Sequence, residues 1–184
     1  MMANRAGSSG QRRAGQAPEP EPWRRAIVAA AIAISVFTLL SVPTWFLIPF
    51  GTSGDSGWTD LGYFALLFIM LMATPVIALA LAFTAGIAVD RRTRHLGIGR
   101  AAAWFAQLAA APALVGTAVA MLSGPVAPWL PFVNLLLPAA AAGAVARLGV
   151  APVLRSRGGV IALVLVTMIL ATAPLLIVAV LRMG

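Results

Sequence analysis

The amino-acid sequence predicts an all-α integral membrane protein, a bundle of five transmembrane helices with a cytoplasmic N-terminus and the C-terminus outside. Two observations predict this class. Of the 184 residues, 61% are hydrophobic and 10% are charged, whereas soluble domains are nearer ~45–50% and ~25%. The hydrophobic residues also lie in long continuous blocks, and a block of ~18 or more is typical of a membrane-spanning helix. The lipid bilayer is therefore the expected surroundings of the chain.

Five apolar segments define the predicted spans. They cover residues 26–50, 61–89, 101–122, 129–146 and 160–181. Even the shortest would be ~27 Å long at ~1.5 Å per residue, close to the ~30 Å hydrocarbon core. Residues 1–22 are rich in Gly, Ser, Pro and Gln, so they cannot bury enough apolar surface to fold. The chain thus divides into a disordered cytoplasmic tail, 1–22, and a transmembrane domain, 23–184.

The arginines predict the orientation, because short loops rich in arginine stay in the cytoplasm. All 13 basic residues are arginines, and with the N-terminus inside only Arg182 lies outside. The inner arginines are Arg5, Arg12, Arg13, Arg24, Arg25, Arg91, Arg92, Arg94, Arg100, Arg147, Arg155 and Arg157. If segment 129–146 were re-entrant, the division would be ten against three, so five full spans fit better. Trp23, Trp58, Trp104 and Trp129 lie within four residues of a predicted span end, which agrees with the preference of indole for the headgroup level.

The composition also indicates a source and a location. Arginine in place of lysine, together with abundant alanine and glycine, is typical of a GC-rich bacterial genome, which is a coding bias and not a physical constraint. The predicted location is the cytoplasmic membrane of a bacterium.

The sequence predicts no catalytic, metal or cofactor site. Ser56 lies in Gly54-Asp55-Ser56-Gly57, a string like the surroundings of a nucleophilic serine, but the only histidine, His95, is predicted on the opposite side of the bilayer. A serine nucleophile needs such a base within hydrogen-bond reach. The chain has no cysteine. Asp90 and His95 remain the one acid–base pair for the alternative of a membrane-embedded enzyme that acts on lipid.

Two sets of residues are candidate contacts. The first set is predicted to contact anionic lipid headgroups from the inner face: Arg24, Arg25, Arg91, Arg92, Arg94 and Arg100. The loop 90–100 has no aromatic platform or folded support, so no nucleic-acid partner is predicted. The second set is predicted to form polar contacts between helices: Thr84 with Gln107 near the inner side, and Thr117 with Asn134 near the outer side, at matched depths.

Every predicted span contains proline, and proline kinks a helix because it lacks an amide hydrogen and clashes with the preceding turn. The prolines are Pro43, Pro49, Pro75, Pro112, Pro131, Pro138 and Pro174. The span interiors contain no ionisable residue, which disfavours transport coupled to a buried carboxylate. The last span has no aromatic residue and is predicted to pack toward the bundle interior.

These observations favour a non-enzymatic role. The leading hypothesis is an accessory or structural membrane subunit that acts through helix packing, with another membrane protein or a second copy as its partner. The alternative is a small porter or channel component that uses the kinked spans around Pro75, Pro112 and Pro174, with Thr74 and Gln107 as candidate polar groups on the solute path.

Overall fold

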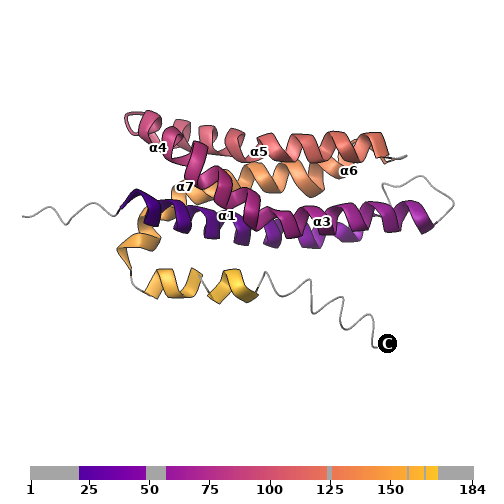
Figure 1. Cartoon of the computed structure of the whole chain (residues 1–184), viewed down its shortest axis with the longest axis horizontal. Helices are drawn as coiled ribbons and strands as arrows, with labels where there is room; N and C mark the ends of the chain where they lie inside the picture. Colours follow the sequence, from indigo (N-terminus) through magenta and orange to yellow (C-terminus); the bar gives the residue numbers. More distant parts are fainter. Residues whose placement is uncertain (1–20, 49–56, 124–125, 157, 164, 170–184) are drawn as a thin grey trace, which may run out of the picture.

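The structure, a computed structural model, is built from long helices that lie side by side (Figure 1). It describes residues 21–48, 57–123, 126–156, 158–163 and 165–169. The predicted tail falls almost wholly on residues 1–20, outside this part of the chain, as do Ser56, Pro49 and Pro174.

Among the residues that the structure describes, four helical segments are long and apolar enough to cross a membrane. The first is α1 (Pro22–Thr44), followed by the 3₁₀ turn η1 (Trp45–Leu47). The second comprises α3 (Gly57–Leu81), the π-helix η2 (Ala82–Gly86) and α4 (Ile87–Thr93). The third is α5 (Ile98–Ser123), and the fourth comprises α6 (Trp129–Pro131), the π-helix η3 (Phe132–Leu136) and α7 (Leu137–Arg155). By length and composition the chain is a multi-pass membrane protein.

The second and fourth segments extend further toward the arginine-rich end than predicted. The predicted loop 90–100 shrinks to a turn at residues 94–97, and helix α7 continues to Arg155 through what was predicted as a loop. Arginine is a good helix former, so a change in hydropathy does not mark the end of a helix. Asp90 and Arg147 consequently lie within these long helices, one residue beyond the predicted spans 61–89 and 129–146.

The fifth predicted span is described only in part, as a short apolar helix, Gly158–Ile169. The Ser156 hydroxyl accepts a hydrogen bond from the amide of Gly159 at 2.9 Å and so caps its start. The prediction that this segment packs toward the interior is wrong for its described residues, since Ile161 is 63% and Ile169 65% exposed. The interior is already filled by α7, and the short helix lies beside the bundle (Figure 1).

Helix α7 forms the centre of the bundle, packed against α1 on one side and α5 on the other. Its buried face repeats at helical spacing as Pro138, Ala139, Ala142, Gly143, Ala146 and Val150. Gly143 lies against the backbone of Phe105, and a Cβ atom on Gly143 would stand only 2.7 Å from the Cβ of Ala109. Small residues of this kind let helix backbones approach closely in membranes.

Irregular turns accompany some of the prolines. The 3₁₀ turn η1 follows Pro43, and the π-helix η3 follows Pro131 directly, whereas Pro75 and Pro112 lie within segments that remain α-helical. Pro138 has no amide hydrogen to offer the carbonyl of Asn134, four residues earlier. The hydroxyl of Ser41, on α1, donates to that carbonyl at 2.9 Å instead. A side chain from a neighbouring helix thus satisfies a carbonyl that proline cannot reach.

Candidate functional site

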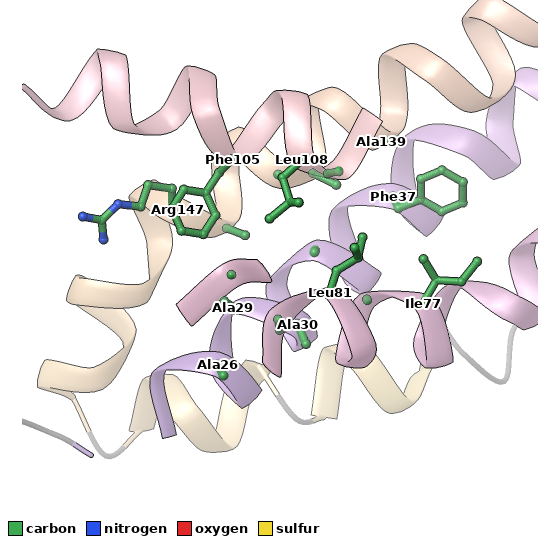
Figure 2. A pocket seen from close by; sticks show the side chains of 18 of the residues that line it. Ala26, Ala29, Ala30, Phe37, Ile77, Leu81, Phe105, Leu108, Ala139 and Arg147 are labelled. Atoms are coloured by element: carbon green, nitrogen blue, oxygen red, sulfur yellow. The ribbon is translucent and has the colours of Figure 1, made fainter. Parts of the chain in front are cut away.

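A cavity of about 180 Å³ lies between α1, the α3–α4 segment, α5 and α7. Figure 1 shows the α3–α4 segment crossing the bundle obliquely, from beside α1 toward the start of α5. Figure 2 shows the cavity from close by, with Arg147 and Phe105 at one end and Phe37 at the other. All four long helices therefore contribute to one half-open site between them.

The wall of the cavity is mainly apolar and rich in alanine. Its half-buried alanines come from three segments: Ala29 and Ala33 on α1, Ala78 and Ala82 on the second segment, and Ala109 and Ala113 on α5. Larger side chains such as Leu81 and Leu108 stand between them (Figure 2). Interiors of proteins are close-packed with few voids larger than a water molecule, so a space of this size at the meeting of four helices is a candidate binding site.

The cavity extends along the helices to roughly the depth of one lipid leaflet. On α1 its lining runs from Pro22 to Phe37, and on α7 it includes Arg147 at the charged end. The fifteen steps from Pro22 to Phe37 at ~1.5 Å each give roughly 22 Å, compared with about 20–22 Å for half of a bilayer that is ~40–45 Å thick with its headgroups. The side chain of Thr74, whose hydroxyl donates to the Met70 carbonyl at 2.8 Å, is a polar group within the apolar part.

One end of the cavity is charged. Asp90 lies 3.2 Å from a terminal nitrogen of Arg147 and 3.5 Å from Nε of Arg94. The Arg147 guanidinium also lies over the ring of Phe105, 5.6 Å from its centroid, a favourable cation–π arrangement. Four arginines and one aspartate line the cavity, which leaves an excess of positive charge at this end: Arg25, Arg91, Arg94, Arg147 and Asp90.

Arg147 is distinguished by an unused donor. Its Nε is buried and has no hydrogen-bond acceptor among the described residues, although the side chain as a whole is 26% exposed. Removing an N–H of a charged group from water without supplying an acceptor costs free energy. Nε itself is covered by protein, so an anionic group in the cavity would interact with the rest of the Arg147 guanidinium.

The structure divides the predicted lipid-contact arginines into two groups. Arg25, Arg91 and Arg94 line the cavity, whereas Arg24, Arg92 and Arg100 lie at the same end of the helices, outside its lining. Arg24 lies over the ring of Trp23 at 5.3 Å.

Sequence reasoning placed Arg147 in a loop and missed its role. The signal that could have found it is the small-residue face of α7, since Ala139, Gly143 and Arg147 follow each other at intervals of four residues. That spacing places the guanidinium on the same face of the helix as the buried small residues.

The two predicted polar pairs have different outcomes. Thr84 and Gln107 are exposed, and the Thr84 hydroxyl donates to the carbonyl of Ala80 in its own helix. Thr117 and Asn134 are both buried, but within the described part of the chain the Thr117 hydroxyl and the Asn134 side-chain oxygen have no hydrogen-bond partner. The Asn134 amide donates instead to the hydroxyl of Tyr63, at 3.5 Å. An interhelical polar contact thus exists at Asn134, with a partner that the sequence did not indicate.

The candidate acid–base pair for lipid chemistry is not assembled. Asp90 is engaged with arginines, and His95 is exposed in the turn after α4. Among the residues that the structure describes, no group of three His, Cys, Asp or Glu side chains is placed to hold a metal ion.

The fold and the cavity define a class, a multi-pass membrane protein with a half-open site between its helices. Comparisons of the chain with protein-family models, with curated proteins and with solved structures find no match. The functional argument therefore depends on the site alone.

Proposed function

We propose that this protein is a non-enzymatic membrane protein that takes a guest molecule into the cavity between its helices, as a small porter or carrier. The observation that carries the proposal is the cavity itself, which all four long helices line and which is apolar along its depth and charged at one end. Binding sites in helical bundles typically lie between helices and combine an apolar wall with a few polar groups.

The irregular segments around the cavity support a carrier. Ala82 and Gly86 of the π-helix η2 and Pro112 of α5 all line it. Single π-turns inside α-helices are frequently found at functional sites, and a weakened ladder of backbone hydrogen bonds lets a helix bend where a guest enters. Thr74 lines the cavity, whereas Gln107 lies outside its lining, so only Thr74 of the two predicted path residues remains a candidate.

The test places a large side chain in the cavity by substitution of one lining alanine. Ala78 lines it, and Ala80, two residues further along the same helix, is exposed and does not. Ala78→Phe and its control Ala80→Phe are reconstituted in liposomes loaded with a defined mixture of amino acids, sugars and small organic anions. Solute release is followed by mass spectrometry, and lipids that copurify with each variant are quantified in parallel.

We expect Ala78→Phe to abolish solute release or lipid retention that the wild-type chain and Ala80→Phe both show. Thr74→Val should change the selectivity of release more than Gln107→Val does. If wild-type protein releases no more solute than empty liposomes and retains no lipid, but copurifies with a stoichiometric partner protein, the accessory role replaces this proposal.

A further inference from the structure

The shape and charge of the cavity limit the class of guest that it can hold. A volume of about 180 Å³ extended over the length of a leaflet is a narrow space, suited to one hydrocarbon chain. Its apolar wall offers a chain the same surroundings as the bilayer, and the excess of arginine at one end offers a partner for a negative group. We infer that the guest is a single-chain lipid with an oxyanionic head, a carboxylate or a phosphate, whose head is bound by Arg147. This inference rests on the proposed function, since it names the guest of that same cavity.

Arg147 is the headgroup receptor because of how its guanidinium is held. The stack on Phe105 and the ion pair with Asp90 fix its plane at the charged end of the cavity (Figure 2). Its Nε has no acceptor among the residues described and is buried. Arginine binds carboxylate and phosphate oxygens through its N–H donors, so an oxyanion at the charged end of the cavity can accept from the terminal nitrogens of this side chain.

Asp90 competes with the guest for Arg147. Its carboxylate occupies a terminal nitrogen of Arg147 at 3.2 Å and also contacts Nε of Arg94 at 3.5 Å. The negative charge of Asp90 offsets part of the positive charge of Arg147 and repels an incoming oxyanion. Removing the charge of Asp90 should therefore strengthen binding of an anionic guest.

The experiment uses the full chain in liposomes with a photoactivatable C12 fatty acid that carries a diazirine at the end of its chain. Crosslinked peptides are mapped by mass spectrometry. Competitors are unlabelled dodecanoate, dodecyl phosphate, dodecanol, dodecyltrimethylammonium and inorganic phosphate. The variants are Arg147→Gln, Asp90→Asn, the double variant and the control Arg155→Gln, an exposed arginine two turns further along α7.

We expect crosslinks on the apolar lining, at peptides that contain Phe37, Met70 or Leu135. Both anionic chains should compete, whereas the alcohol, the cation and inorganic phosphate should not. Arg147→Gln should reduce crosslinking by about tenfold, as expected for loss of a charge-assisted hydrogen bond. Asp90→Asn should increase it several-fold, and Arg155→Gln should leave it unchanged.

The double variant separates binding from folding, since it removes both charges of the pair and leaves neither unpaired. A monodisperse double variant that still crosslinks as weakly as Arg147→Gln would support the role of Arg147. The headgroup assignment would be overturned if the anionic chains, the alcohol and the cation competed equally and Arg147→Gln crosslinked like the wild-type chain. The proposed guest cavity would then still stand. Competition by inorganic phosphate at the concentration of the anionic chains would show that the site does not recognise the hydrocarbon chain of the guest. Absence of any crosslink to the cavity lining in the wild-type chain would overturn the lipid guest, whereas the proposed function would still stand if the wild-type chain releases solute and Ala78→Phe does not.

Discussion

Helix α7 contacts α5 and α1 closely along its length, whereas the α3–α4 segment faces α7 across a cavity. Both regions are rich in alanine. On the close side, the backbone of Phe105 approaches Gly143 so nearly that no Cβ would fit. On the open side, alanines such as Ala78 and Ala113 face space. The difference shows that small residues bring helices together only where the helices also run alongside one another.

The second segment is joined to the fourth by a polar contact near each of its ends. Near its start, the Tyr63 hydroxyl accepts a hydrogen bond from Asn134. Near its end, Asp90 pairs with Arg147 of α7. The segment crosses the bundle obliquely between these two contacts (Figure 1). Leu67 and Leu71 pack in the apolar core, and Ala78 and Ala82 further along line the cavity.

The largest expected effect is on the close side. Gly143→Ala forces the α5 and α7 backbones apart, and overpacking of this kind costs about 1–3 kcal/mol. The free energy of unfolding, measured by titration with SDS in mixed micelles, should fall by that amount. Gly99→Ala is the control, since a Cβ there meets nothing within 4 Å and alanine is the better helix former. An equal loss in both variants would show that the close contact of α5 with α7 is not specific.

The next effect tests the contact near the start of the second segment. Asn134→Leu removes the hydrogen bond to Tyr63 from a fully buried position. Interhelical hydrogen bonds in membranes contribute ~0.6 kcal/mol on average and at most ~1.7, so a loss of about 1 kcal/mol is expected. Tyr63→Phe should lose a similar amount, and the double variant should lose little more than either single one. Additive losses would mean that the two side chains do not act as a pair.

A smaller effect is expected on the outer side of α1. The hydroxyls of Ser35 and Thr167 lie 2.8 Å apart and join α1 to the short helix that follows Ser156. Each hydroxyl is also within donor distance of a carbonyl in its own helix, Ser35 with Ala31 and Thr167 with Leu163. A double-mutant cycle of Ser35→Ala and Thr167→Ala should give a coupling of about 0.6 kcal/mol or less. Hydrogen exchange should rise in the short helix and not in α7. A rise in α7 as well would show that the two helices do not open independently.

The smallest effect concerns the polar residues that face away from both regions. Thr84 and Gln107 are exposed, and substitutions at exposed positions without a specific contact usually change stability by less than ~0.5 kcal/mol. Thr84→Ala and Gln107→Ala, alone and together, should therefore unfold like the wild-type chain. A coupling between them above ~0.5 kcal/mol would restore the pairing that their matched depth predicted.

The sequence predicts the class of protein well and the site poorly. Hydropathy alone identifies the four long helices, and every described arginine lies at or near the end where α1 and α5 begin and α4 and α7 end, in agreement with the predicted charge asymmetry. The side of the membrane that this end faces stays a prediction. Helix ends were missed because Asp90 and Arg147 are polar enough to suggest a loop yet are stabilised within helices by each other.

The cavity could not be predicted, because the same residue type closes one interface and opens another. Nothing in the local sequence shows that Ala109 and Ala113 of α5 line a cavity, or that Ala109 also lies against Gly143 of α7. Which alanines face space depends on the angle at which the second segment crosses the bundle. That angle is fixed by contacts between residues 71 and 57 positions apart, Tyr63 with Asn134 and Asp90 with Arg147.

The hydroxyl of Ser41 makes two distant positions mutually dependent over evolutionary time. It donates to the Asn134 carbonyl that Pro138 leaves without its usual donor. A lineage that first replaces Pro138 by alanine gains an amide hydrogen, after which Ser41 becomes expendable. A lineage that loses Ser41 first passes through an intermediate with an unsatisfied buried carbonyl, a cost of about 1–3 kcal/mol. The order of the two substitutions, and not only their identity, therefore decides whether this helix junction can change.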